Sequence, residues 1–415
     1  MFNVMKIAAR NLLRYRRRTM LTTLLITIGI VAVLLFIALS GSFRELMVGQ
    51  ITDSMLGHIQ IHRKGYVASL DSLPLTRNMK PQMVAKVSET LDELDNVQAW
   101  SPRIKFGAMF SNFTETTNIR LNAVIPEREV QTCPLLPGRI IEGDKHGPLV
   151  SKGKILIPEL LAKGMKVKVG DTVVIVATNK DGSVNGKTFT VQGILEGISG
   201  PGGRDGYMHI DDARELLRIE GNEISEIAIR LKDPAKLDKT YAALQKTIGS
   251  LKNQQGQPAF EVHKWEKLSP FSSIARMIDM LDLFIKIMLV SIVLISIMNV
   301  MLMAVYERIR EIGTISAIGT SPSRILALFV SEGLLLGILG SLIGIVISIT
   351  TIYILNIKTL TFSFGRQDNL VLQPTIGSGD IIIIGTVVIT VAILASLQPA
   401  WKASRMDPIM ALRHV

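Results

Sequence analysis

The sequence predicts an α-helical membrane protein with four transmembrane helices and a large α+β extracytosolic domain inserted between the first and second helices. Two observations predict this fold class. Hydrophobic residues make up 48% of the 415 residues and charged residues 20%, which mixes lipid-facing sequence with water-soluble sequence. The apolar residues also gather into four nearly uncharged runs of about 20 residues or more, the length that a helix needs to cross the hydrocarbon.

The four apolar runs give the expected spans, which are residues 19–43, 283–306, 325–357 and 381–401. The net charge of +11 arises largely from basic residues beside these runs, which favours a membrane over a nucleic-acid partner. The positive-inside rule then places residues 1–18, 307–324 and 402–415 in the cytosol, and residues 44–282 and the loop 358–380 outside it. The first run is longer than the apolar core of a signal peptide, so we expect an uncleaved anchor.

The stretch 44–282 is long enough for one or two compact domains. A strand, helix and strand pattern near its start recurs near its end, and a β-rich segment lies between. We therefore expect one sheet built from a βαβ-type lobe of residues 44–125 and 221–270, with a second lobe, residues 126–220, inserted. The expected strands are 57–62, 97–106, 154–157, 172–177, 187–194, 224–231 and 260–263, and the expected helices are 81–94 and 235–248.

Motifs for catalysis or metal binding are weak. The run from Gly182 to Thr188 resembles a phosphate-binding loop but is one residue short and lies between strand patterns, so we expect a hairpin turn. His58 and His62 share a face of a predicted strand, but about 13 Å separates them, too far for one metal ion, and we expect them on the surface. The single cysteine, Cys133, excludes an intrachain disulfide and is expected to be buried. We predict no catalytic residue, no metal site and no enzymatic activity.

The third span contains an acidic residue, Glu332. Two interpretations are open, because an acid inside a membrane span is costly and often functional. The simpler one is a side chain that reaches the cytosolic interface, since Arg324 lies about two turns away; the other is a buried partner between helices. Gly333, Gly337 and Gly340, with Gly344, have the spacing that permits close helix approach, so we expect them to pack in the core.

A short segment between the second and third spans, Glu307 to Gly319, has charges at its front and apolar residues at helical spacing behind. Composition alone leaves open a partner-binding helix and an inert positive-inside loop. The sequence E-R-I-R-E-I-G followed by A-I-G resembles the coupling helix of the FtsX-like and MacB-type permeases of ABC transporters, where this pattern marks the contact with the ATPase. The resemblance implies coupling roles for Glu307, Arg308, Arg310, Glu311, Gly313, Ala317 and Gly319.

Other segments resemble the same family. Residues 9–19 are similar to its amphipathic N-terminal elbow, which makes 1–18 the expected elbow helix, and residues 399–413 are similar to its C-terminal signature. The chain length and the sequence Gly41 to Leu46 resemble the lipoprotein-releasing permeases most closely. The resemblance implies a permease subunit of the cell inner membrane that pairs with a second copy or a paralogue. It also implies a cytosolic ABC ATPase dimer that binds ATP and Mg, with no cofactor on this chain.

The implied substrate is a lipid-anchored protein whose lipid enters between the first and second spans of opposing subunits, with a periplasmic carrier as a further candidate partner. By position, the candidate lining residues are Phe36, Leu39, Phe43, Leu283 and Met288, although ordinary lipid-facing residues explain them equally well. Pro201 and Arg204, in the loop from Ser199 to Gly206, are candidates for carrier contact. A plain turn is the simpler interpretation of that loop.

Two other functions remain open on the sequence. One is a MacB-like exporter of peptides or toxic compounds, which the sequence does not separate strongly from lipoprotein release. The other is an FtsX-like regulator that uses ATP-driven motion to switch an extracytosolic hydrolase. The large extracytosolic domain argues mildly against the regulator.

Overall fold

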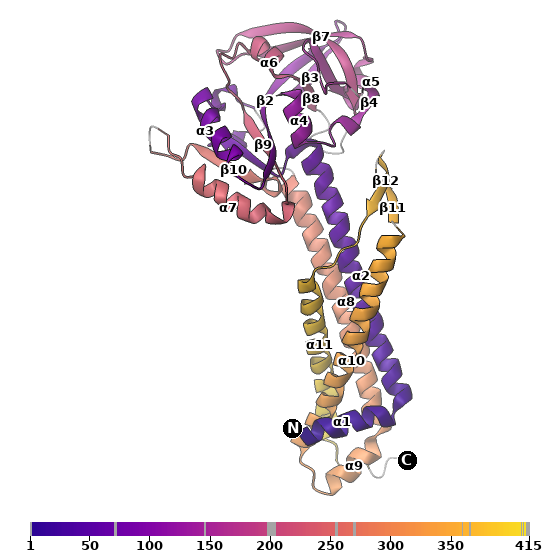
Figure 1. The fold of residues 1–415 in the computed structure, drawn as a ribbon. Helices are drawn as coiled ribbons and strands as arrows, with labels where there is room; N and C mark the ends of the chain where they lie inside the picture. Colours follow the sequence, from indigo (N-terminus) through magenta and orange to yellow (C-terminus); the bar gives the residue numbers. More distant parts are fainter. Residues whose placement is uncertain are drawn as a thin grey trace. The chain divides into compact units, whose positions relative to one another are not determined.

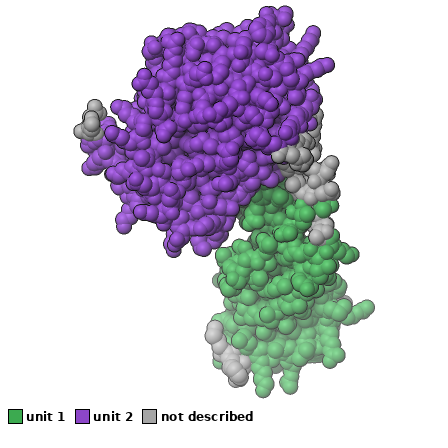
Figure 2. All heavy atoms as spheres, turned by 45° about the horizontal axis from the view of Figure 1, so that its top comes forward, with its two compact units in different colours: residues 1–46, 277–415 green, residues 47–276 purple. Residues whose placement is uncertain are grey.

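The computed structural model describes residues 2–69, 73–144, 147–196, 205–253, 256–268, 271–358, 360–364, 367–407, 409 and 411. The chain divides into two compact units (Figures 1 and 2): unit 1 is residues 1–46 with 277–415, and unit 2 is residues 47–276. Within the described ranges, four helices are long and apolar enough to cross a membrane, which confirms the four predicted spans as a class. These are Arg16–Leu56, Arg276–Glu307, Pro322–Ile357 and Ser378–Ser404.

Unit 1 is helical. Its helices are α1 (Phe2–Arg14), α2 (Arg16–Ile51, which continues into unit 2), α8 (Phe271–Glu307), α9 (Ile309–Ala317), α10 (Pro322–Ile357) and α11 (Ser378–Ser404). The expected loop after the third span contains an antiparallel hairpin of β11 (Leu360–Phe364) and β12 (Gln367–Leu372). Figure 1 shows α1 crossing the helix ends close to α9.

Small residues on α10 let two other helices approach it closely. A Cβ added at Gly337 would lie 2.8 Å from Cβ of Ala392 on α11, and one added at Gly344 would lie 2.9 Å from Cβ of Ile30 on α2. Gly333 and Gly340 are equally confined. The predicted packing role of these glycines is confirmed, because a larger side chain has no room at the helix contacts.

Unit 2 is built on a ten-stranded sheet in the part of the chain that the structure describes, with order β10-β1-β9-β2-β3-β8-β5-β7-β4 and with β6 paired to β2 and β7. Its strands are β1 (Ile59–Arg63), β2 (Val97–Ser111), β3 (Thr116–Val124), β4 (Ile140–Gly143), β5 (Lys154–Pro158), β6 (Thr172–Thr178), β7 (Val184–Leu195), β8 (Asp205–His209), β9 (Glu226–Leu231) and β10 (Phe260–Lys264). Its helices are α3 (Pro81–Asp92), α4 (Pro126–Thr132), α5 (Glu159–Met165), α6 (Ile210–Leu217) and α7 (Leu237–Thr247).

Both ends of the extracytosolic sequence contribute to this sheet, as predicted. Strand β1 pairs antiparallel with β9 and β10, which follow it by more than 160 residues. The long strand β2 pairs with β9 over its first half and with β3 over its second, so the sheet continues into the inserted segment. The predicted hairpin is present, since β6 and β7 pair with Thr178 opposite Val184, but its turn is residues 179–183, and Val184 to Thr188 belong to β7.

His58, the residue before β1, and His62, on β1, are buried, and the expectation of surface positions is wrong. His58 is 6% exposed and His62 is fully buried, because both faces of β1 are covered, as the burial of Gln60 on the same face and of Ile61 on the other shows. Nε2 of His62 lies 3.4 Å from Oε2 of Glu226, and its ring stacks on Tyr66 at 5.3 Å between centroids. Cys133 is buried as predicted.

Candidate functional site

Three helices and a connecting turn meet at the carboxylate of Glu332, which lies on α10 and is fully buried. Nδ2 of Asn11, on α1, donates to its Oε1 at 2.8 Å, and Nη1 of Arg308, in the turn between α8 and α9, donates to the same oxygen at 2.9 Å. Nη2 of Arg18, on α2, lies 3.6 Å from Oε2, which is ion-pair distance. This carboxylate therefore joins α1, α2 and α10 to the turn before α9.

The expectation that Glu332 reaches an aqueous interface is wrong. Helix α1 packs across α10 and covers the site, as Asn11 and Leu12 show by their contacts with α10 and its core. A carboxylate withdrawn from water needs paired charges and hydrogen bonds, which Arg308 and Arg18 supply. The buried interhelical partner is the interpretation that the structure supports.

A second carboxylate, Glu311 on α9, extends this network. Nε of Arg308 donates to Oε2 of Glu311 at 2.9 Å, and the Tyr15 hydroxyl donates to Oε1 at 2.6 Å. The Arg308 guanidinium also lies 5.3 Å from the centroid of the Tyr15 ring. Burial acts to raise the pKa of Glu311, but the hydrogen bonds from Tyr15 and Arg308 outweigh it and lower that pKa, so Glu311 stays ionised at neutral pH.

Helix α9 has one anchored face and one open face. Ile312 is 4% exposed and packs in the core of unit 1, whereas Ile315 is 38% and Ile318 is 80% exposed. The helix ends in a Schellman motif: Gly319 has φ +95°, its N–H donates to Ser316 O, and Thr320 N–H donates to Ile315 O. Only glycine adopts that backbone conformation at no steric cost, which explains the glycine of the A-I-G sequence.

The predicted coupling residues therefore divide between the two faces. Arg308, Glu311 and Gly313 lie on the anchored side, whereas Glu307, Arg310, Ala317 and Gly319 are exposed. The coupling motif did not identify the residues that hold the helix in place, which are Asn11, Tyr15, Arg18 and Glu332. It also did not identify the exposed apolar residues Ile315 and Ile318 as functional. The acid in the third span was the one sequence signal for this network.

The candidate substrate-lining residues lie on α2 and α8. Phe43, Leu283 and Met288 are exposed in unit 1, at 41%, 58% and 49%, and Phe36 and Leu39 are half-buried. The two helices are joined at this end by a hydrogen bond from Ser40 Oγ to Asp282 Oδ1 at 2.9 Å and by an ion pair of Arg44 with Asp279 at 3.1 Å. The lining role stays a prediction.

The candidate carrier-contact residues Pro201 and Arg204 lie outside the described residues. Across the residues that the structure does describe, no group of three or more His, Cys, Asp or Glu side chains is placed to hold a metal ion.

Two family models match the chain. A MacB-like periplasmic core domain matches residues 19–247, and an FtsX-like permease C-terminal domain matches residues 283–408. The lipoprotein-releasing system transmembrane protein LolC of Neisseria meningitidis serogroup B is 22% identical over 428 residues, which cover 95% of this chain and 94% of that protein. The macrolide export ATP-binding/permease protein MacB of Bdellovibrio bacteriovorus is 25% identical over 415 residues, which cover 96% of this chain and 59% of that protein.

Proposed function

Since this chain belongs to the family of ABC transporter permeases with a MacB-like periplasmic core domain and an FtsX-like C-terminal domain, we propose that it is the membrane subunit of a lipoprotein-releasing transporter. In this proposal a separate cytosolic ATPase dimer binds ATP and Mg and contacts α9. Unit 2 is the periplasmic domain, and the chain resides in the bacterial inner membrane with a second copy or a paralogue as its partner.

The observation that carries the proposal is the pair of hydrogen bonds that Arg308 donates, one to Glu311 and one to Glu332. Because these side chains tie α9 to α10, and Arg18 extends the tie to α2, a displacement of α9 must move the spans with it. A helix attached only by flexible loops would absorb the displacement instead. The exposed apolar side chains of Ile315 and Ile318 give the ATPase a surface to hold.

The proposed cargo fits the need for such coupling. A lipid anchor leaves the bilayer at a cost of about 0.8 kcal/mol for each buried CH₂, so an acylated protein does not leave the membrane without an energy source. We propose that the anchor enters between α2 of one subunit and α8 of the opposing subunit, near Phe43 and Leu283, and that the periplasmic domain passes the protein on to a carrier.

A second candidate function is export of the MacB kind, which the alignment with the Bdellovibrio protein over 96% of this chain favours. Depletion of the protein followed by fractionation of acylated proteins separates the candidates. Lipoproteins retained in the inner membrane support release. Drug hypersensitivity without retention supports export, and a defect in cell-wall hydrolysis without either supports a regulatory role.

A further inference from the structure

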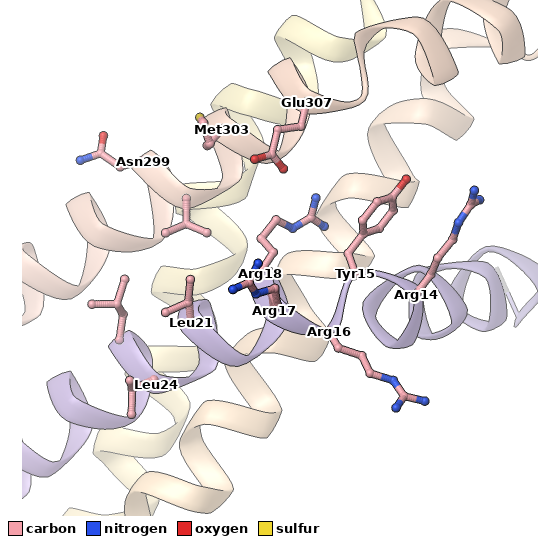
Figure 3. A pocket seen from close by; sticks show the side chains of 12 residues that line it. Arg14, Tyr15, Arg16, Arg17, Arg18, Leu21, Leu24, Asn299, Met303 and Glu307 are labelled. Atoms are coloured by element: carbon pink, nitrogen blue, oxygen red, sulfur yellow. The ribbon is translucent and has the colours of Figure 1, made fainter.

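A groove of about 980 Å³ runs between α2 and α8 in unit 1, at the end where α1 joins α2 (Figure 3). Figure 3 shows its basic side chains gathered at one end, with Leu21 and Leu24 further along α2 and Asn299 and Met303 on α8. The groove is lined by Arg14, Tyr15, Arg16, Arg17, Arg18, Leu21, Leu24, Leu25, Asn299, Val300, Met303 and Glu307.

The basic end carries positive charge that the protein does not neutralise. Among the described side chains, Arg14, Arg16 and Arg17 form no ion pair with a carboxylate, and all three are exposed. Arg18 pairs with Glu332, yet its Nη1 is buried without a hydrogen-bond partner among the described atoms. Glu307 is the one acid in the lining, so the charge at this end is strongly positive.

The other end of the groove is apolar and open. Leu21 is 58% exposed, Leu24 50% and Met303 58%. These side chains continue directly from the arginines into the membrane-spanning part of α2 and α8. A positive end followed by an apolar channel is complementary to an amphiphile with an anionic head and a hydrocarbon tail.

We propose that this groove binds an anionic glycerophospholipid of the leaflet next to α1. The headgroup phosphate lies against Arg17, with Arg16 adding to the positive charge of this end, since planar guanidinium groups match phosphate oxygens in pairs, and one acyl chain lies along Leu24 and Met303. The site differs from the proposed entry of the lipid-anchored cargo, because Phe43 lies 25 residues beyond Arg18, about 37 Å along the helix.

The lipid site also adjoins the network that anchors α9. Arg18 lines the groove and pairs with Glu332, and Glu332 accepts the hydrogen bond from Arg308. A lipid in the groove would therefore lie beside Arg18, which belongs to this network. The inference does not depend on which cargo the transporter carries.

Native mass spectrometry of the purified full chain, released from detergent micelles, tests the proposal. Phosphatidylglycerol and phosphatidylcholine with the same acyl chains are titrated separately. The wild-type protein is expected to retain phosphatidylglycerol at about tenfold lower lipid concentration. R16Q/R17Q is expected to lose that preference, whereas K6Q/R10Q is expected to keep it, because both removed charges lie on the exposed side of α1 outside the groove.

A second variant tests the apolar end of the groove. It also keeps the proposal testable if R16Q/R17Q fails to fold. M303W fills the groove while all four arginines stay, and it is expected to weaken retention of phosphatidylglycerol with an unchanged melting temperature. Equal retention of the two lipids by the wild type, or unchanged preference in both R16Q/R17Q and M303W, overturns the proposal. Displacement of the lipid by millimolar inorganic phosphate also overturns it, because that result describes a simple anion site.

Discussion

Nη1 of Arg308 donates a hydrogen bond to Oε1 of Glu332 at 2.9 Å, and both side chains are withdrawn from solvent. The same guanidinium holds Glu311 through Nε, so one side chain connects α9 to α10. A buried charge is tolerated only when its partners are present, which makes this connection sensitive to the loss of any member. It also gives α9 a fixed attachment to the spans, on which the proposed transmission of motion depends.

Glu332→Leu is expected to destabilise the protein by about 3–5 kcal/mol, because Arg308 and Arg18 are left buried without their carboxylate. Denaturant unfolding in detergent measures the change. The double variant Arg308→Met with Glu332→Leu is expected to recover part of the stability, since Arg18 stays unpaired and Glu311 loses its bond to Arg308, and it is not expected to recover the stimulation of the partner ATPase. Equal stability of the single variant and the wild type would contradict the buried network.

Ile318→Asp is expected to reduce stimulation of the partner ATPase by at least tenfold with little change in melting temperature, since this side chain is 80% exposed and supports no core packing. A charge there opposes burial against a partner protein. Ser323→Asp is the matched control, because it adds the same charge at an exposed position five residues further on. Equal effects of the two variants would argue against α9 as the contact surface.

Gly337→Ala is expected to destabilise unit 1 by about 1–3 kcal/mol, since the added methyl group would lie 2.8 Å from Cβ of Ala392. Gly385→Ala is the comparison, because its methyl group would meet Ile345 at an ordinary contact distance of 3.5 Å. The difference in melting temperature between the two variants measures the tightness of the contact of α10 with α11. No difference would mean that these helices are loosely packed.

The stability of unit 2 is expected to fall as the pH drops from 7 to 5. Burial lowers the pKa of His62, although Glu226 opposes that effect, so the folded state keeps this ring neutral while the unfolded state protonates it below its ordinary pKa of 6.5. Protons then favour unfolding. Lys105, His263 and Tyr66 complete the surroundings of the ring.

His62→Gln is expected to flatten this pH dependence. Thermal unfolding of the full chain, followed by tryptophan fluorescence at pH 5, 6 and 7, provides the comparison. Parallel curves for the variant and the wild type would show that another group titrates. Glu226 affects stability only at lower pH. Burial acts to raise its pKa, but Lys105, His62 and Arg103 outweigh burial, and the pKa is lowered. The contribution of Glu226 to the stability of unit 2 is therefore lost only below about pH 4.3.

Local sequence patterns predicted where helices and strands lie better than they predicted which surroundings each element has in the fold. Alternation of apolar residues located β1, β9 and β10, and the recurrence of the pattern predicted that they share one sheet. The same alternation indicates one buried face and one exposed face, but both faces of β1 are buried, so it wrongly predicts surface positions for His58 and His62. Strand β2 continues five residues past its predicted end, beyond Gly107, where the absence of a side chain interrupts the pattern.

The candidate site was predictable only in its contiguous part. The segment from Glu307 to Gly319 was recognised because its residues are neighbours in sequence. The bonds that hold it join residues far apart, such as Tyr15 with Glu311 over 296 positions and Asn11 with Glu332 over 321. No spacing rule connects residues at such separations, so only the three-dimensional arrangement shows that Glu332 is buried.

The proposed transport by a partner ATPase requires that α9 faces the compartment that holds ATP and that unit 2 faces the opposite compartment. Labelling of single cysteines with a membrane-impermeant maleimide in spheroplasts tests this directly. Burial raises the pKa of Cys133 to about 12, so the wild-type chain is an unreactive background. Val184→Cys, at a position 65% exposed in unit 2, and Ile318→Cys, at the end of α9, provide the two reporters.

We expect Val184→Cys to be labelled in intact spheroplasts and Ile318→Cys to be labelled only after the membrane is permeabilised. Labelling of Ile318→Cys in intact spheroplasts, with Val184→Cys protected, would contradict this expectation.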